Sequence, residues 1–111
     1  MVKRGPVVRG EIWLVNLDLT IGSEIQKTRP CVVISPPEMN DYLRTAIIAP
    51  MTTRSRPASC RIAVRHGGKH GLILLDQIRT IGKALLVKRA GAIAPEALRA
   101  TLAALDEIFA E

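Results

Sequence analysis

Three short polar clusters in this chain contain the residue types that bind an anionic ligand. Each cluster borders an apolar segment, and loops held by a rigid core are common places for binding and chemistry. Guanidinium groups form paired hydrogen bonds with phosphate, hydroxyl groups donate to phosphate oxygens, and amides and carboxylates bind the edges of bases. The candidate residues are Gly22, Ser23, Glu24, Lys27 and Arg29 in the first cluster, Thr52, Thr53 and Arg54 in the second, and Asp76, Gln77 and Arg79 in the third.

The positive charge of the chain is confined to one part of it. Residues 1–93 carry 15 Lys and Arg against 6 Asp and Glu, a net charge of +9, whereas residues 94–111 carry 1 against 4, a net charge of −3. A basic surface attracts phosphate backbones and acidic protein segments. Charge that only keeps the protein soluble would give the same composition, so the charge agrees with an anionic partner without identifying one.

The length of 111 residues predicts one domain spanning residues 1–111. Residues 1–6 lack the apolar stretch of a signal peptide, and no apolar run is long enough to span a bilayer, so we expect no membrane association. The two cysteines, Cys31 and Cys60, lie inside apolar runs and are expected to be small core residues of a reduced, cytoplasmic protein.

Short apolar or alternating runs predict strands within residues 9–90. The runs cover residues 11–18, 30–35, 45–51, 60–65, 72–75 and 85–89, and Gly and Pro residues separate several of them. Pro50 near the end of its run suggests an edge strand or a bulge, and the glycines of 67–71 predict a turn or hairpin loop. These elements favour a mainly β fold, a small curved sheet or barrel of antiparallel strands.

One helix is predicted over residues 95–110. Pro95 suits the first helical position. An apolar stripe follows at helical spacing and is expected to pack onto the sheet. The stripe consists of Leu98, Leu102, Leu105 and Phe109.

Two histidines and the single tryptophan invite functional interpretations that we do not favour. His66 and His70 flank a glycine turn and have no third ligand nearby, so we expect solvent-exposed loop residues and no metal site. Trp13 could stack on a base, but its strand position favours core packing.

The order and spacing of several motifs are similar to those of a known family. The chain resembles the MazF/PemK family of toxin–antitoxin endoribonucleases, the mRNA interferases, over nearly its whole length. The motifs are Arg9-Gly10-Glu11-Ile12-Trp13-Leu14-Val15, the loop from Gly22-Ser23-Glu24 to Arg29-Pro30, Ala49-Pro50-Met51-Thr52-Thr53, Leu74-Leu75-Asp76-Gln77-Ile78-Arg79-Thr80-Ile81, and the closing helix.

The resemblance implies an SH3-like barrel of the plasmid-maintenance-toxin type with a C-terminal helix, working as a homodimer. It implies sequence-specific cleavage of single-stranded RNA or mRNA without a metal or other cofactor, which inhibits translation and growth. The 2′-hydroxyl would attack the neighbouring phosphate, leaving a 2′,3′-cyclic phosphate and a 5′-hydroxyl. The expected protein partner is an acidic antitoxin, MazE- or PemI-like, whose tail blocks the RNA groove.

The resemblance also assigns roles to residues. Arg29 matches the catalytic arginine of the family, Thr52 its catalytic threonine, and Glu24 a carboxylate implicated in activity. Asp76 has a counterpart near the active site in part of the family. However, Leu74 stands where some relatives carry a catalytic arginine, and this favours an arrangement centred on Arg29 and Thr52.

Without the resemblance, simpler explanations remain open. Arg29 could pair with Glu24 on the surface, Thr52 could bond to backbone groups at a strand end, and Asp76 could brace a turn. Two other functions also remain: a toxin of the same fold that poisons DNA gyrase without cutting RNA, and a non-catalytic RNA-binding module.

Overall fold

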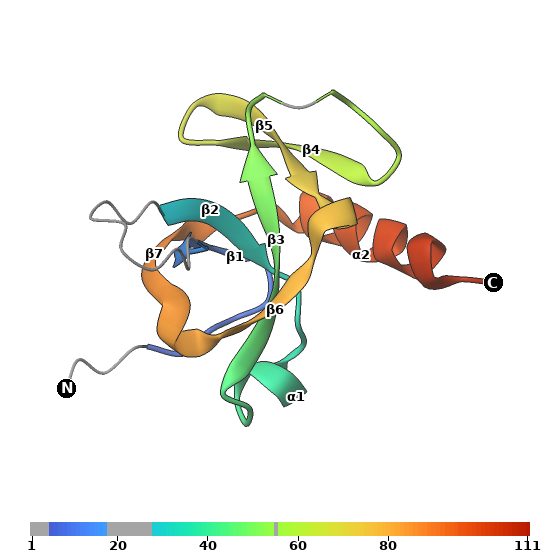
Figure 1. The fold of residues 1–111 in the computed structure, drawn as a ribbon. Helices are drawn as coiled ribbons and strands as arrows, with labels where there is room; N and C mark the ends of the chain where they lie inside the picture. The colour runs from blue at the N-terminus through green and yellow to red at the C-terminus, as the bar shows by residue number, and fades with distance from the viewer. Residues whose placement is uncertain (1–4, 18–27, 55) are drawn as a thin grey trace.

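Seven strands and a long C-terminal helix make up most of the molecule (Figure 1). The computed structural model describes residues 5–17, 28–54 and 56–111. The strands are β1 (Glu11–Asn16), β2 (Thr28–Val33), β3 (Thr45–Thr52), β4 (Arg61–His66), β5 (Lys69–Leu74), β6 (Arg79–Gly82) and β7 (Leu86–Ala92). The helices are α1 (Pro37–Asn40) and α2 (Pro95–Phe109), with 3-10 turns at Leu75–Gln77 and Lys83–Leu85. The predicted mainly β fold with a C-terminal helix is confirmed.

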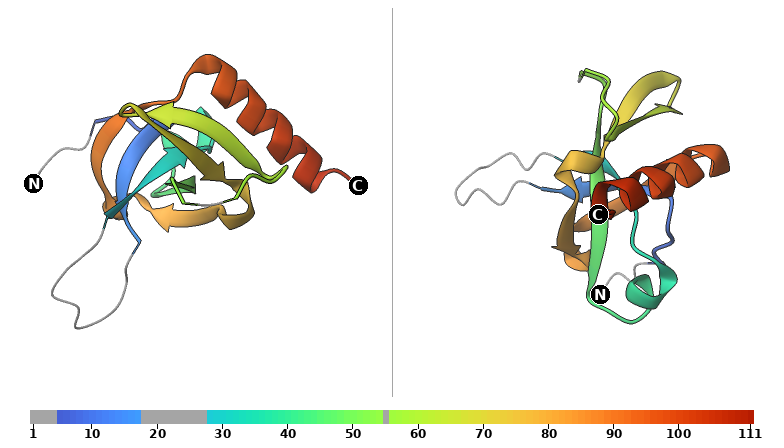
Figure 2. Two further views of the ribbon diagram at one scale, coloured as in Figure 1. Left: turned by 90° about the horizontal axis from the view of Figure 1, so that it is seen from above. Right: turned by 90° about the vertical axis from the view of Figure 1, so that its right-hand side faces the viewer.

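The strands form one antiparallel sheet in the order β4-β5-β3-β2-β1-β7, and β6 also pairs with β3. The sheet curls, and α2 lies across one side of it (Figure 2). No helix in residues 5–17, 28–54 and 56–111 is long and apolar enough to cross a membrane.

Strand β3 is the centre of the sheet because it pairs with three others. Its residues 45–48 pair with β6 and residues 51–52 pair with β5, while β2 pairs along its other edge. The prediction that Pro50 marks an edge strand is therefore wrong. On one edge of β3, Pro50 lies opposite Cys31 of β2. On the other edge, Pro50 lies between the residues that pair with β6 and those that pair with β5. A residue without an N–H group is tolerated there because neither ladder on that edge includes it.

The core has two buried clusters on opposite faces of the curved sheet. Strand β2 contributes to both, since Cys31 and Val33 belong to one cluster and Val32 to the other. Ile34, directly after the strand, also belongs to the second cluster. Trp13 is buried in the first cluster, as predicted. Cys31 is buried in the core, as predicted, whereas Cys60 is only partly buried, so its predicted core position is wrong.

Helix α2 covers the second cluster with a face that matches the predicted stripe only in part. Phe109 is 71 % exposed, so its predicted packing onto the sheet is wrong. Leu105 packs against the core as predicted. Ala97 and Ala104, which the prediction did not include, pack beside it, and the fully buried Thr101 donates its hydroxyl proton to the Ala97 carbonyl.

The predicted turn before residue 72 is a tight β4–β5 hairpin. Gly67 and Gly68 both have positive φ, 59° and 77°, which is typical of a two-residue type I′ turn. The turn fixes His66 directly opposite Lys69 at the end of the hairpin. Two side chains that are far from the other clusters in sequence are thereby held on one face.

Candidate functional site

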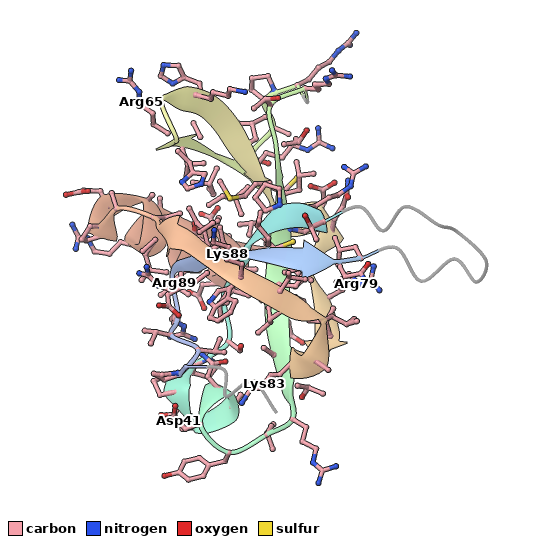
Figure 3. All side chains as sticks on the ribbon, turned by 90° about the vertical axis from the view of Figure 1, so that its left-hand side faces the viewer. Asp41, Arg65, Arg79, Lys83, Lys88 and Arg89 are labelled. Atoms are coloured by element: carbon pink, nitrogen blue, oxygen red, sulfur yellow. The ribbon has the colours of Figure 1, made fainter. Side chains whose placement is uncertain are left out.

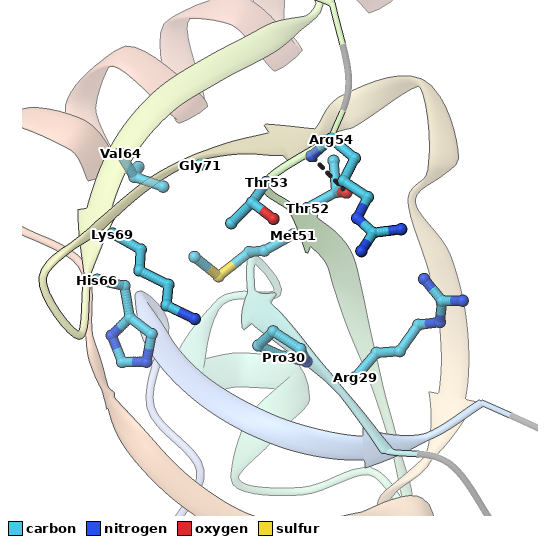
Figure 4. Close-up of a pocket in the computed structure, with 10 residues that line it drawn as sticks. All are labelled: Arg29, Pro30, Met51, Thr52, Thr53, Arg54, Val64, His66, Lys69 and Gly71. Carbon is cyan, nitrogen blue, oxygen red and sulfur yellow. Dashed lines mark hydrogen bonds between the residues drawn. The ribbon is translucent and has the colours of Figure 1, made fainter.

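Two hollows in the surface meet at Arg29 and Thr52. The first hollow has a volume of about 490 Å³ and the second about 670 Å³. Arg29, Met51 and Thr52 line both, so they form the ridge between them. The remaining lining residues of the first hollow are Pro30, Thr53, Arg54, Val64, His66, Lys69 and Gly71 (Figure 4), and those of the second are Leu17, Pro50, Leu74, Gln77, Ile78 and Arg79.

The pairing register of the sheet brings Arg29 and Thr52 together. Strands β2 and β3 pair with Val33 opposite Ile48, Val32 opposite Ala49 and Cys31 opposite Pro50. Continuing this antiparallel register by two residues places Arg29 opposite Thr52. Opposite residues of an antiparallel pair point to the same face of the sheet. In agreement with this extension of the register, Arg29 and Thr52 line both hollows although the two residues are far apart in the chain.

The Thr52 hydroxyl is oriented by a local hydrogen bond. Its oxygen accepts the backbone N–H of Arg54 at 3.2 Å. The simpler explanation, a hydroxyl that satisfies a backbone group, is thus part of the structure. The Thr52 hydroxyl can form a further hydrogen bond, because a hydroxyl also carries one proton to donate. With no acceptor for that proton among the described residues, it is available to a ligand on the ridge.

The walls of the site are rich in cations. Arg29 and Arg54 are both exposed, and their guanidinium groups point toward one another across the ridge (Figure 4). Lys69 adds an ammonium to the first hollow and Arg79 a guanidinium to the second. The two ion pairs among the described residues, Arg61–Asp76 and Arg89–Glu11, involve none of these four groups. Such an arrangement suits the phosphates of an extended strand.

Asp76 lies away from both hollows, unlike its neighbours. Gln77 and Arg79 line the second hollow. The Asp76 carboxylate instead accepts two hydrogen bonds from Arg61, at 3.3 Å from Nε and 3.2 Å from Nη2. These bonds hold the pKa of Asp76 below its usual value. Arg61 also donates to the carbonyl of Arg56, so Asp76 braces the segment after β3, in agreement with the simpler explanation.

Four of the predicted site residues lie outside the described residues. These are Gly22, Ser23, Glu24 and Lys27. Their predicted roles, including a surface pair between Glu24 and Arg29, stay predictions. Thr53 and Arg54 line the first hollow beside Thr52.

The sequence interpretation missed the far wall of the first hollow. His66 was expected to be a solvent-exposed loop residue, but it ends β4 and is half-buried, so that expectation is wrong. His70 is exposed, as expected. The signal that could have found His66 is the glycine pair at 67–68, because a two-residue turn makes residues 66 and 69 direct neighbours.

A metal site was not expected from the sequence. Within the described part of the chain, no group of three or more His, Cys, Asp and Glu side chains could hold a metal ion. Arg29, Thr52 and their cationic neighbours offer charge stabilisation and hydrogen bonding.

Comparison with known proteins supplies the context for this geometry. A family model described as "PemK-like, MazF-like toxin of type II toxin-antitoxin system" matches residues 8–109. The chain is 31% identical over 110 residues to the endoribonuclease toxin MazF of Escherichia coli strain K12, with 98% of this chain and 99% of that protein covered. It is 36% identical over 84 residues to the Escherichia coli endoribonuclease PemK, covering 71% of this chain and 63% of that protein.

Solved structures agree on the fold. MazF from Deinococcus radiodurans superposes with a TM-score of 0.78 at 19% identity, covering 95% of this chain and 97% of that one. An endoribonuclease from a mycobacterial species, solved in complex with its cognate antitoxin, gives a TM-score of 0.75 at 22% identity, covering 91% and 92%.

Proposed function

Because this chain belongs to the family of PemK-like, MazF-like toxins of type II toxin–antitoxin systems, we propose that it is a sequence-specific endoribonuclease that cleaves single-stranded RNA. The observation that carries this proposal is the placement of Arg29 beside Thr52 on the ridge between two hollows. A single strand can cross such a ridge with its scissile phosphate at the pair and one neighbouring nucleotide in each hollow.

The proposed reaction is an attack by the RNA's own 2′-hydroxyl on the adjacent phosphorus. The new P–O2′ bond forms as the P–O5′ bond breaks, which leaves a 2′,3′-cyclic phosphate and a 5′-hydroxyl. A base must take the proton of the 2′-hydroxyl, and the departing O5′ must receive one. Glu24 is our candidate for the base. No metal takes part in this proposal.

Arg29 would stabilise the negative charge that develops on the phosphorane. A guanidinium is charged throughout the physiological pH range and binds two phosphate oxygens at once. The Thr52 hydroxyl, already bonded to the backbone N–H of Arg54, would donate its proton to one of these oxygens. Fixed donors of this kind typically contribute about 10²–10³ in kcat each.

The same cations support an acidic antitoxin as the partner. A segment rich in Asp and Glu could lie across the ridge and exclude RNA by pairing with Arg29, Arg54, Lys69 and Arg79. Its binding should therefore weaken steeply as salt is raised. We also propose that the toxin acts in the cytoplasm, where RNA is available and thiols stay reduced, and that it works as a homodimer.

The test is incubation of the purified protein with a long RNA in EDTA. We expect fragments that carry 2′,3′-cyclic phosphate and 5′-hydroxyl ends, and intact RNA would refute the metal-free reaction. Arg29→Ala should abolish cleavage. Arg65→Ala is the matched control, because Arg65 is an exposed strand arginine that points into solvent on the hairpin (Figure 3) and lines neither hollow.

The same variant separates the alternative functions. Growth inhibition that persists in Arg29→Ala would indicate a toxin that acts on another target, such as a topoisomerase. RNA retained on a filter without cleavage by the unaltered protein would indicate a binding module.

A further inference from the structure

We propose that the far wall of the first hollow binds the base of a nucleotide next to the scissile phosphate, and that His66 and Lys69 determine which base is accepted there. This proposal rests on the proposed RNA cleavage and names the recognition element for one position of the RNA. The cleavage step itself assigns no role to either residue.

The first hollow has two opposite walls, one with two arginines that suit a phosphate and one with a histidine and a lysine. Arg29 and Arg54 stand on one side, and His66 and Lys69 stand across the hollow from them (Figure 4). A nucleotide has the same division, with a charged phosphate at one end and a flat base at the other. A phosphate held at Arg29 therefore directs its neighbouring base toward the hairpin. The volume of about 490 Å³ lies in the range of pockets that enclose small ligands.

The hollow offers apolar surface for the faces of a base. Met51 and Val64 are nearly buried, at 7 % and 8 % exposure, and Pro30 adds a ring. Aromatic side chains are the usual stacking partners of bases, but an apolar surface that includes a polarisable thioether can also cover the face of a base. Beside this surface, the imidazole of His66 can both donate and accept hydrogen bonds, and the Lys69 ammonium only donates. The combination can distinguish the edges of bases as well as enclose their faces.

His66 is held in place by its surroundings, as a recognition group must be. Gly91 of β7 lies against the imidazole, and a Cβ built on Gly91 would be 3.3 Å from His66 Cε1. Gly91 also has a φ of 142°, so a side chain there would be strained as well as crowded. The I′ turn fixes the facing position of Lys69. The hairpin thus holds both side chains in place before RNA binds, which lowers the entropic cost of binding.

The experiment maps the 5′ ends produced from a random RNA pool by the unaltered protein and by three variants. We expect His66→Ala to relax the base preference at a single position adjacent to the cut, with preferences elsewhere unchanged. On the preferred substrate it should raise KM about tenfold, because a base contact of this kind is worth roughly a factor of ten in affinity. The kcat should change less than twofold. Lys69→Met, which keeps the length of the side chain, should relax the same position.

His70→Ala is the matched control for His66→Ala. His70 lies in the same hairpin, but it is exposed and lines neither hollow, so its variant should give the unaltered profile. Equal urea midpoints for all variants will show that folding is intact. If His66→Ala fails to fold, the exposed Lys69→Met still decides the question.

Two outcomes overturn the proposal while leaving RNA cleavage standing. One is an unchanged cleavage profile in both His66→Ala and Lys69→Met. The other is an equal loss of cleavage at every site, which would mean that the hollow binds backbone phosphate and not a base. If the unaltered protein does not cleave the pool at all, the proposed function itself fails, and the two failures are thereby distinguished.

Discussion

Replacing Glu11 should destabilise the fold through a network that lies away from the two hollows. Glu11 is 9 % exposed and accepts three hydrogen bonds. Its Oε1 accepts the Val8 N–H at 2.7 Å and the Trp13 Nε1–H at 3.2 Å, and its Oε2 bonds to Arg89 Nε. The Glu11 carboxylate thus ties the N-terminal segment and β1 to β7. The Arg-Gly-Glu-Ile-Trp motif, on this evidence, builds the scaffold.

The loss of stability in Glu11→Ala depends on whether each of the three donors can find another hydrogen-bond acceptor. Trp13 is only 5 % exposed, so its N–H would lose its partner, at a cost of about 1–3 kcal/mol. Val8 and Arg89 are about half exposed and can bond to water, so each adds about 0–1 kcal/mol. We expect a total of about 1–5 kcal/mol, against a typical free energy of unfolding of about 5–15 kcal/mol.

Urea unfolding followed by tryptophan fluorescence will measure this loss. With a urea dependence of about 2 kcal/mol per M, the midpoint of Glu11→Ala should fall by about 0.5–2.5 M. Glu11→Gln should lose only about 1 kcal/mol. The amide oxygen still accepts from Val8 and Trp13, and the bond from Arg89 is lost because an amide NH2 cannot accept it, but the half-exposed Arg89 can bond to water instead. An unchanged midpoint in Glu11→Ala would refute the assignment. Lost cleavage at an unchanged midpoint would assign Glu11 to the reaction.

The pH dependence gives a second check on Glu11. Burial raises the pKa of this carboxyl, but the hydrogen bonds from Arg89, Val8 and Trp13 outweigh burial, and the pKa lies below its usual 4.5. A carboxyl with a lower pKa in the folded state binds its proton more weakly there than in the unfolded chain. Its contribution to stability is therefore present above the unfolded pKa and is lost as the pH falls through the folded pKa. The stability advantage over Glu11→Gln should shrink in acid below about pH 4.5.

Three further predictions follow from other contacts. In Gly71→Ala the new Cβ would stand 3.0 Å from the Thr52 carbonyl oxygen, so kcat should fall at least about tenfold and stability by about 1–3 kcal/mol; normal kinetics would contradict the importance of this close approach. Asp76→Asn should leave cleavage within about twofold of normal, because its carboxylate bonds to an arginine of β4 and faces neither hollow; a large loss would return it to the site. Cys31 is fully buried and burial raises its pKa to about 12, so a thiol reagent should label only Cys60 in the native protein; two reactive thiols before urea is added would contradict this burial.

The positions of the strands were largely predictable because the signals are local. The apolar run 45–51 became β3 at Thr45–Thr52, and the glycines of 67–68 became the hairpin turn. Strand β2 was predicted over 30–35 but is observed at Thr28–Val33. Its start is set by pairing with β1, where Asn16 lies opposite Thr28, and a non-local partner leaves no mark in the run itself.

The packed face of α2 was not predictable from hydrophobic spacing alone. Thr101 is polar and fully buried, which is possible because its hydroxyl bonds to the Ala97 carbonyl within the same helix. Phe109 is apolar and 71 % exposed, near the end of the helix. Apolar spacing identifies the period of a helix, but the depth to which each residue is buried depends on the surface opposite.

The geometry of the site was even less predictable from the sequence, because it depends on which strands pair with β3. Arg29 and Thr52 could be named from the resemblance, but only the β2–β3 register explains why they meet. On the other edge of β3, β6 pairs up to Ile48 and β5 begins at Met51, so the sheet divides at Pro50. Beyond the division the β4–β5 hairpin leaves the curled sheet (Figure 1), and one hollow lies on each side of the ridge. Pro50 thus stands where β3 changes its partner from β6 to β5. Because of this change, the hollows on the two sides of the ridge are lined by different strands.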